Sequence, residues 1–286
     1  MQQLQIAFIG GGNMAEALIS GLRKAGHDGS LITVSEPLAS RRDYLIENYA
    51  VRCVESNANA ANNAANDAAN NAANNAANNA ANNADILLLA VKPQHMQDAL
   101  KGLAQHLKAD ATVISIAAGL STTSLHAWLG DTANIVRVMP NTPALVGAGM
   151  SVLFSAADEI HKQRSEYVLN ACGECLRVDD EQMMHAVTAV SGSGPAYLFL
   201  MAEVMQATGQ KLGLDAEVAA KLAAQTVFGA GKMLVQSGRS AEALRHQVTS
   251  PGGTTQAALD ALYDDGVPGA IRKAVVAASK RSQELS

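Results

Sequence analysis

Residues 4–18 read LQIAFIGGGNMAEAL, and this stretch decides the fold. The apolar run Leu4–Ile9 is typical of a buried strand, and residues 15–25 have the spacing of a helix. The glycines between them fit G-x-G-x-x-A, in which the first glycine makes a tight turn and the second lets the backbone approach a diphosphate. The sequence therefore predicts a dinucleotide-binding turn at the start of a helix, with a plain strand–helix turn as the alternative.

Glu36 follows the second apolar run, Leu31–Ser35, where the same fingerprint expects an acidic residue. A carboxylate there can bind the 2′-hydroxyl of an NAD ribose and would repel a 2′-phosphate. Ser35, Arg41 and Arg42 stand close enough in the sequence to bind the phosphate of NADP instead. The sequence leaves both cofactors open.

Apolar runs alternate with helix-spaced segments through the first 180 residues. The expected strands are Leu4–Ile9, Leu31–Ser35, Val51–Val54, Ile86–Val91, Thr112–Ala117, Ile135–Met139, Met150–Phe154 and Leu176–Val178, and the helices between them include 15–25, 38–49 and 96–107. This predicts an α/β domain over residues 1–180, with a Rossmann-type, doubly wound, mostly parallel sheet. Most of these runs end in turn-forming or polar clusters, which favours a ligand site at the carboxyl edge of the sheet.

From residue 181 onward only helical spacing remains, over 183–190, 196–212, 216–234, 241–248, 255–262 and 268–282. We therefore expect an all-helical domain over residues 181–286, whose many small side chains allow close helix packing within or between chains. Residues 248–255 read VTSPGGTT and lead into one of these helices. They form either an anion pocket of converging N–H groups or a turn with Thr254 or Thr255 as the helix cap.

Composition excludes several classes of protein. The 286 residues carry a formal charge of −5, which argues against nucleic-acid binding, and the longest apolar run, about Ile86–Val91, is too short to span a membrane. The start lacks a secretory signal and three cysteines make no disulfide framework, so we expect a soluble cytoplasmic protein.

No metal-site motif is present, and Cys172-Gly173-Glu174-Cys175 favours plain structure over a redox or zinc site. Residues 57–84 consist of Asn and Ala apart from Asp67, which predicts an exposed insertion without chemistry, helical or disordered.

Six motifs follow one another along essentially the whole chain except the Asn/Ala insertion: FIGGGNMAEAL at 8–18, LLLAVKPQ ending at 94, SIAAG at 115–119, RVMPNTP at 137–143, SGSGPAY at 191–197 and VTSPGGTT at 248–255. In this order they resemble the pyrroline-5-carboxylate reductase family. The resemblance implies reduction of the C=N bond of 1-pyrroline-5-carboxylate to L-proline by NADPH or NADH, the last step of proline biosynthesis. It also implies a C-terminal helical domain that pairs two chains, as a homodimer or an assembly of dimers.

The resemblance places site residues by their position in these motifs. The implied cofactor contacts are Gly10, Gly11, Gly12, Asn13, Met14, Ala15, Glu36, Asn57, Ala90, Val91, Lys92, Pro93, Ile116, Ala117 and Ala118. The implied substrate contacts are Ser250, Gly252, Gly253, Thr254 and Thr255, with the Thr255 hydroxyl on the ring nitrogen as the catalytic contact. A protonated imine accepts hydride directly, so this chemistry needs no metal.

Two rival hypotheses remain from the sequence. Another two-domain NAD(P) enzyme, such as a β-hydroxyacid dehydrogenase, shares the architecture but is expected to have a Lys-based helix motif and no SPGGTT turn. A cofactor-binding regulator without turnover belongs to a different class. Consumption of reduced cofactor in the presence of pyrroline-5-carboxylate separates an enzyme from such a regulator.

Overall fold

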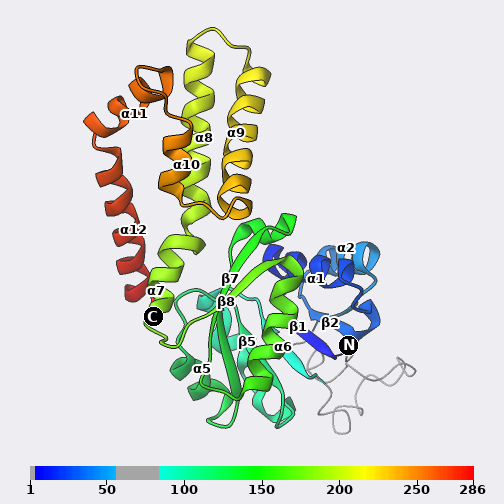
Figure 1. Ribbon diagram of the computed structural model, residues 1–286. Helices are drawn as coiled ribbons and strands as arrows, with labels where there is room; N and C mark the ends of the chain where they lie inside the picture. Colours follow the sequence, from blue (N-terminus) through cyan, green and yellow to red (C-terminus); the bar gives the residue numbers. More distant parts are fainter. Residues whose placement is uncertain (1–3, 56–83) are drawn as a thin grey trace. The chain divides into compact units, whose positions relative to one another are not determined.

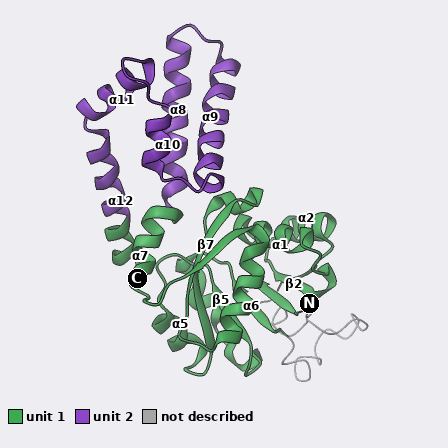
Figure 2. Ribbon diagram, viewed as in Figure 1, with its two compact units in different colours: residues 1–192, 279–286 green, residues 193–278 purple. Residues whose placement is uncertain are grey.

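The computed structural model describes residues 4–55 and 84–286, so Asn57 and all of the Asn/Ala repeat but Ala84 lie outside the described residues. The chain forms two compact units, shown in different colours in Figure 2. Unit 1 comprises residues 1–192 and 279–286, and unit 2 comprises residues 193–278. Each is described by itself below.

Unit 1 is built on one sheet, several strands of which are labelled in Figure 1. In the described residues this sheet has eight strands, in the order β3-β2-β1-β4-β5-β6-β7-β8. The strands are β1 (Ile6–Ile9), β2 (Ile32–Ser35), β3 (Arg52–Val54), β4 (Ile86–Leu89), β5 (Thr112–Ser115), β6 (Asn134–Met139), β7 (Gly149–Phe154) and β8 (Gly173–Arg177). All neighbours pair in parallel except β6 and β7, which are antiparallel. The expected doubly wound, mostly parallel sheet is confirmed.

Helices cover both faces of this sheet. They are α1 (Asn13–Lys24), α2 (Ala39–Tyr49), α4 (Met96–Leu100), α5 (Thr122–Leu129) and α6 (Glu159–Leu169). Ile6 and Phe8 of β1 point into a core shared with α1, α2 and α6, whereas Ala7 and Ile9 point into a second core shared with α4 and α5. The central strands β1 and β4 are fully buried because each face of the sheet is covered, which explains their continuous apolar sequence.

Most expected elements differ from the structure by one or two residues at an end, and two differ by more. The helix expected over 96–107 ends as α4 at Leu100, since Gly102 takes a positive φ of 75° and a short 3-10 turn follows. The last strand, expected at Leu176–Val178, is present as β8 but begins earlier, at Gly173, and ends at Arg177. β8 lies at the edge of the sheet and contains charged side chains, so it lacks the apolar run by which buried strands are recognised.

The end of unit 1 includes part of the region expected to be the helical domain. Helix α7 (Met183–Val187) continues as a π-helical turn, Thr188–Gly192, that stays with the sheet. The last residues of α12 (Val267–Glu284) belong to the same unit, where Ser282 Oγ lies 3.0 Å from Nδ1 of His185 and both side chains are buried. The compact units therefore change over at Gly192, later than the boundary of 180/181 that the sequence suggests.

Unit 2 consists of helices in its described length. They are α8 (Gly194–Lys211), α9 (Ala216–Gln236), α10 (Ala241–Gln247), α11 (Thr254–Asp264) and most of α12. Very little of this unit is buried: α8 and α11 have no buried residue, and α9 buries only Ala219 and Ala223. The helices expected from the sequence are present, but a single copy of unit 2 has almost no core of its own.

Gly21 lies where α1 packs closely against residues 171 and 172, just before β8. An added Cβ at Gly21 would lie 2.4 Å from the carbonyl oxygen of Ala171 and 2.5 Å from Sγ of Cys172. We expect Gly21→Ala to lower the free energy of unfolding by about 1–3 kcal/mol, because the helix that begins at the glycine turn has to move. Gly269→Ala in α12 is the matched control, since its Cβ would have no neighbour closer than 3.9 Å. Chemical denaturation measures both, and equal stability of the two variants would contradict the close packing.

Candidate nucleotide edge and substrate turn

Four neighbouring strands of unit 1 end at the same level of the sheet. Ser35 pairs with Ile9, Ile9 with Leu89, and Leu89 with Ser115, and each is the last residue of its strand. The residue after each strand still donates its N–H across the sheet: Gly10 to Ser35 O at 2.9 Å, Ala90 to Ile9 O at 2.8 Å, and Ile116 to Leu89 O at 3.2 Å. The structure thus brings Gly10, Glu36, Ala90 and Ile116 side by side at the carboxyl edge of the sheet. We call this line the nucleotide edge.

The order of the strands reverses at β1, because β2 and β3 lie on one side of it and β4 and β5 on the other. In open α/β sheets, such a reversal opens a crevice between the loops that leave the two central strands. The nucleotide edge therefore has the topology of a ligand site in this fold class.

The three glycines have separate steric roles. Gly10 has a φ of +99° and packs against β4, because a Cβ there would lie 3.0 Å from both Ala90 O and Val91 Cγ1. Gly12 is exposed, and a Cβ there would have no neighbour within 4 Å. Gly12 is also the N-cap of α1 and provides no side-chain cap, so the first N–H groups of the helix are available to an anion. In this fold class, a helix start of this kind is where a diphosphate binds.

Glu36 is held against the glycine turn. Its side chain reaches back from the end of β2, where Oε2 accepts a hydrogen bond from Gly11 N at 3.0 Å and Oε1 accepts one from Leu38 N at 3.0 Å. Gly11 is glycine for the same reason, since a Cβ would lie 2.9 Å from Leu45 Cδ1 and 3.2 Å from Oε2 of Glu36. The sequence placed Glu36 at the correct strand end, but only the structure shows that the glycine turn binds its carboxylate.

Arg41 is engaged by the protein itself. Its Nε donates to Gly11 O at 2.7 Å, and its Nη2 forms an ion pair with Glu16. The hydroxyls of Tyr44 and Tyr49 donate to the same Glu16 carboxylate at 2.9 and 2.8 Å. Burial alone would raise the pKa of Glu16, but Arg41 and the two tyrosines outweigh it and the pKa lies below its usual value. Sequence reasoning missed this cluster because its members come from two helices.

The remaining predicted cofactor residues follow β4 and β5. Ala90, Val91, Pro93 and Ile116 are half-buried, Ala117 is buried, and Lys92 and Ala118 are exposed. Gly119, next in line, has a φ of +81°, and a Cβ there would lie 2.9 Å from the carbonyl oxygen of Leu285. The last turn of the chain thus covers the turn that follows β5.

Two polar links hold neighbouring loops of unit 1, and sequence reasoning assigned neither. Asn141 accepts a hydrogen bond from Met150 N at 2.8 Å and donates to Ser191 O at 3.1 Å, which joins the turn after β6 to the π-helical turn. The buried Arg137 pairs with Glu181 at 2.8 Å, and Glu181 also accepts from Thr122 N and Oγ1. Burial acts to raise the pKa of Glu181, but these donors outweigh it and lower the pKa.

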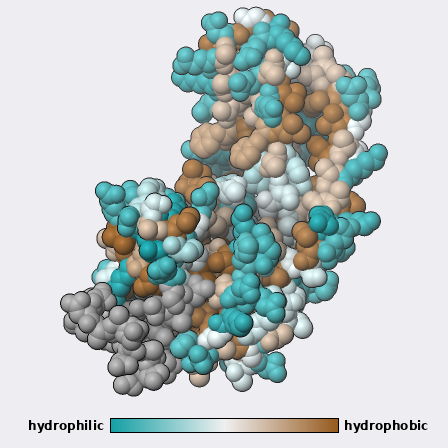
Figure 3. Space-filling model, turned by 180° about the vertical axis from the view of Figure 1, so that it is seen from behind, coloured by the Kyte–Doolittle hydropathy of each residue, from teal (hydrophilic) through white to brown (hydrophobic). Residues whose placement is uncertain are grey.

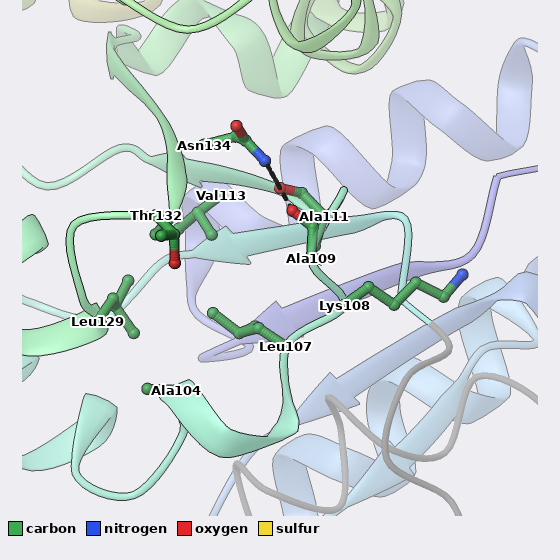
Figure 4. Close-up of a pocket in the computed structure, with 10 residues that line it drawn as sticks. Ala104, Leu107, Lys108, Ala109, Ala111, Val113, Leu129, Thr132 and Asn134 are labelled. Atoms are coloured by element: carbon green, nitrogen blue, oxygen red, sulfur yellow. Dashed lines mark hydrogen bonds between the residues drawn. The ribbon is translucent and has the colours of Figure 1, made fainter.

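Two cavities of unit 1 lie away from the nucleotide edge. A cavity of about 80 Å³ at the amino ends of β5 and β6 is lined by residues such as Leu107, Val113 and Leu129 (Figure 4). Asn134 closes one side of it by donating to the carbonyl oxygens of Ala109 and Ala111, both at 3.2 Å. A second, of about 240 Å³, is lined in part by Thr122, His126 and Asp131. Neither contains a predicted cofactor residue.

The surroundings of Cys172 and Cys175 are those of structural residues, because burial disfavours the reactive thiolate form. Cys172 is buried and its thiol donates to Ala17 O at 3.2 Å, while burial raises its pKa to about 11. Burial likewise raises the pKa of Cys175, in β8, to about 12. All three cysteines are free, and within residues 4–55 and 84–286 no group of His, Cys, Asp or Glu is arranged to hold a metal ion.

In unit 2, residues 248–255 form a tight turn between α10 and α11. Gly253 N donates to Ser250 O at 3.0 Å, and Gly252 takes a φ of +71°. The sequence allowed Thr254 or Thr255 as the cap, but Gly253 is the N-cap of α11 and no side chain caps the helix. Thr254 and Thr255 are instead the first two helical residues, so the first N–H groups of α11 and the hydroxyl of the half-buried Thr255 remain available to a ligand.

The surface of unit 2 carries large apolar side chains over several helices (Figure 3). Phe199 and Leu200 on α8, Phe228 and Val235 on α9, and Val276 on α12 are each more than half exposed. Large exposed apolar surfaces are typical of sites that bind another protein, a membrane or a ligand. No helix among the described residues has the length and apolarity that crossing a membrane requires.

Two family models match the chain. Pyrroline-5-carboxylate reductase dimerisation matches residues 181–285, and NADP oxidoreductase coenzyme F420-dependent matches residues 5–119. The second match contains the glycine turn, Glu36 and the turns after β4 and β5, and the first contains the 248–255 turn.

Relatives match over the full length. The chain is 42% identical to pyrroline-5-carboxylate reductase of Pseudomonas aeruginosa and 41% identical to that of Haemophilus influenzae, covering 100% of this chain and 98% of each relative. Among solved structures, the enzyme of Coxiella burnetii is 36% identical with a TM-score of 0.87 and covers 100% of this chain and 99% of that one. A Plasmodium falciparum pyrroline carboxylate reductase with NADP bound is 28% identical with a TM-score of 0.82, over 100% of this chain and 99% of that one. The chain belongs to the pyrroline-5-carboxylate reductase family.

Proposed function

We propose that the chain reduces the C=N bond of 1-pyrroline-5-carboxylate to L-proline, with NADH or NADPH as the hydride donor, in the last step of proline biosynthesis. The observation that carries the proposal is the pair of glycine N-caps without side-chain caps, Gly12 before α1 and Gly253 before α11. A dinucleotide presents a diphosphate and pyrroline-5-carboxylate presents a carboxylate. Each helix start offers free N–H groups to one of these anions.

The nucleotide edge binds the dinucleotide in this proposal. The backbone from Gly12 to Met14, of which Gly12 and Asn13 are exposed, faces the diphosphate, and Glu36 lies on the adenosine ribose side. The turns Ala90–Pro93 and Ile116–Ala118 line the course of the nucleotide toward the nicotinamide. Asn57, the remaining predicted contact, lies outside the described residues. The reduced nicotinamide supplies a hydride when it is bound.

The 248–255 turn binds the substrate. The N–H groups at Thr254 and Thr255 hold its carboxylate, and Ser250, Gly252 and Gly253 shape the turn around it, since Gly253 N already donates to Ser250 O. Thr255 Oγ1 accepts the N–H of the protonated imine and so fixes the ring. When the hydride adds to the imine carbon, the C=N electron pair moves to nitrogen, which keeps its proton and becomes the secondary amine of L-proline. Positive charge on the imine is lost in this step, so positioning and electrostatics supply most of the rate acceleration.

The apolar surface of unit 2 supports a homodimer as the working form. One copy of unit 2 has little core and leaves Phe199, Leu200 and Phe228 exposed. A second copy of the same helices would cover these side chains.

The three free cysteines suit a reducing compartment, so we place the enzyme in the cytoplasm.

Removing one hydroxyl tests the substrate turn. We expect Thr255→Ala to lower kcat about 10- to 100-fold, because a hydrogen bond to a charged group is lost, while the dissociation constant for NADH or NADPH stays unchanged. Thr255→Ser retains the hydroxyl and is expected to recover most of the rate. Thr249→Ala is the matched control, since that hydroxyl donates to Arg245 O at 2.7 Å in the preceding turn. Full turnover by Thr255→Ala would refute the role of Thr255.

Association of unit 2 is tested by mass measurement in solution. The full chain is expected to sediment as a dimer or a multiple of it at micromolar concentration, and Phe199→Glu is expected to shift it toward monomer, because a charge then lies in the apolar interface. Ile160→Glu, on α6 of unit 1, makes the same kind of change on another exposed apolar residue and is expected to leave the mass unchanged. A monomeric wild-type chain would contradict the dimer.

A further inference from the structure

We infer that Glu36 makes this chain select NADH over NADPH; the inference rests on the dinucleotide site proposed above and deepens it. It starts from the fixed position of the Glu36 carboxylate. Glu36 N donates to Val54 O at 2.9 Å, so its backbone is still part of the sheet, and only 8% of the residue is exposed. The side chain therefore has little freedom to swing away from an incoming ribose.

Two main-chain N–H groups hold the carboxylate in place. Gly11 N donates to Oε2 and Leu38 N donates to Oε1, each at 3.0 Å. Rotating the carboxylate away would leave both N–H groups without these acceptors, which is unfavourable at a site that is mostly buried. Glu36 is thus a structural part of the glycine turn as well as a candidate ligand contact.

The carboxylate retains acceptor capacity for a sugar. A carboxylate oxygen has two lone pairs, and the main chain uses one on each oxygen. The hydroxyls of an adenosine ribose are donors that match the two free positions. A 2′-phosphate offers no donor when fully ionised and brings negative charge against a carboxylate that cannot move aside. The geometry therefore favours the ribose of NADH.

The two neighbouring arginines already bind protein groups, so they are not fully available to neutralise the charge of a 2′-phosphate. Arg41 is committed to Gly11 O and to the Glu16 carboxylate, which Tyr44 and Tyr49 also hold. Arg42 donates through Nη1 to the carbonyl oxygens of Glu36 and Pro37, at 2.8 and 2.7 Å. These contacts hold both guanidinium groups at the β2–α2 turn, so a 2′-phosphate would meet only the N–H groups that they leave over.

Calorimetry with two adenosine probes tests the inference without turnover. ADP-ribose and 2′-phospho-ADP-ribose differ only at the 2′ position and lack the nicotinamide, so the ratio of their affinities reports the surroundings of the 2′ position. We expect the wild-type chain to bind ADP-ribose at least about tenfold more tightly, as like-charge contact at a desolvated site predicts. Equal affinity, or tighter binding of the phosphorylated probe, would overturn the selectivity while leaving the dinucleotide site intact. Binding of neither probe would overturn the dinucleotide site and the selectivity together.

A charge-neutral variant assigns the selectivity to Glu36. Glu36→Gln is expected to reduce the preference for ADP-ribose at least about tenfold, because the negative charge is removed while the side chain keeps its size. Glu47→Gln removes the same charge from an exposed position on α2 and is expected to leave the preference unchanged. A Glu36→Gln variant with an unchanged melting temperature and an unchanged preference would contradict the assignment. Should that variant fail to fold, the wild-type ratio of affinities still decides the inference.

Discussion

The shared ending of four parallel strands is the constraint on which the rest of the nucleotide edge depends. The last residues of these strands pair with one another across the sheet, and we call this row a rung; they are Ser35, Ile9, Leu89 and Ser115. Main-chain hydrogen bonds continue for one residue beyond the rung. This fixes that the chain must turn at Gly10. Only glycine fits at that position, because the contacts with Ala90 and Val91 leave no room for a side chain. The start of α1 and the position of Glu36 follow from the same rung.

The two proposed ligand sites use the same physical device in different units. At each, a glycine with no side chain precedes a helix, so that the helix N-terminus stays open instead of being capped by the protein. Glycine in place of a good side-chain cap costs helix stability roughly a few tenths of a kcal/mol. That cost is consistent with a site whose N–H groups remain free to bind an anion. Reduction of a protonated imine depends mainly on positioning the substrate in this way.

The main features of the fold could be predicted from the sequence, because buried strands and amphipathic helices have strong patterns. The positions of β1, β2, β4 and β5 followed from continuous apolar runs, and α1 from its glycines. The start of β8 could not, since an edge strand such as Gly173–Arg177 needs no continuous apolar run. The direction of β7 and the return of α12 to unit 1 also have no local signal, because they depend on contacts between distant segments.

The candidate site was predictable to a similar degree. Counting along the chain located Glu36, but the hydrogen bonds that hold its carboxylate to Gly11 and Leu38 join segments that sequence spacing does not relate. The sequence also left Arg41 free to bind a phosphate, whereas the structure pairs it with Glu16. At the other turn, local sequence allowed a threonine cap, and the backbone geometry assigns the cap to Gly253.

The most direct measurement mixes the purified full chain with 1-pyrroline-5-carboxylate and a reduced nicotinamide cofactor. The absorbance of the cofactor and the amount of L-proline are followed together. The proposed chemistry predicts one molecule of L-proline for each molecule of cofactor oxidised, with NADH used more efficiently than NADPH. A chain that binds the cofactor but neither oxidises it nor forms L-proline would be a regulator without turnover, and that result would contradict the account.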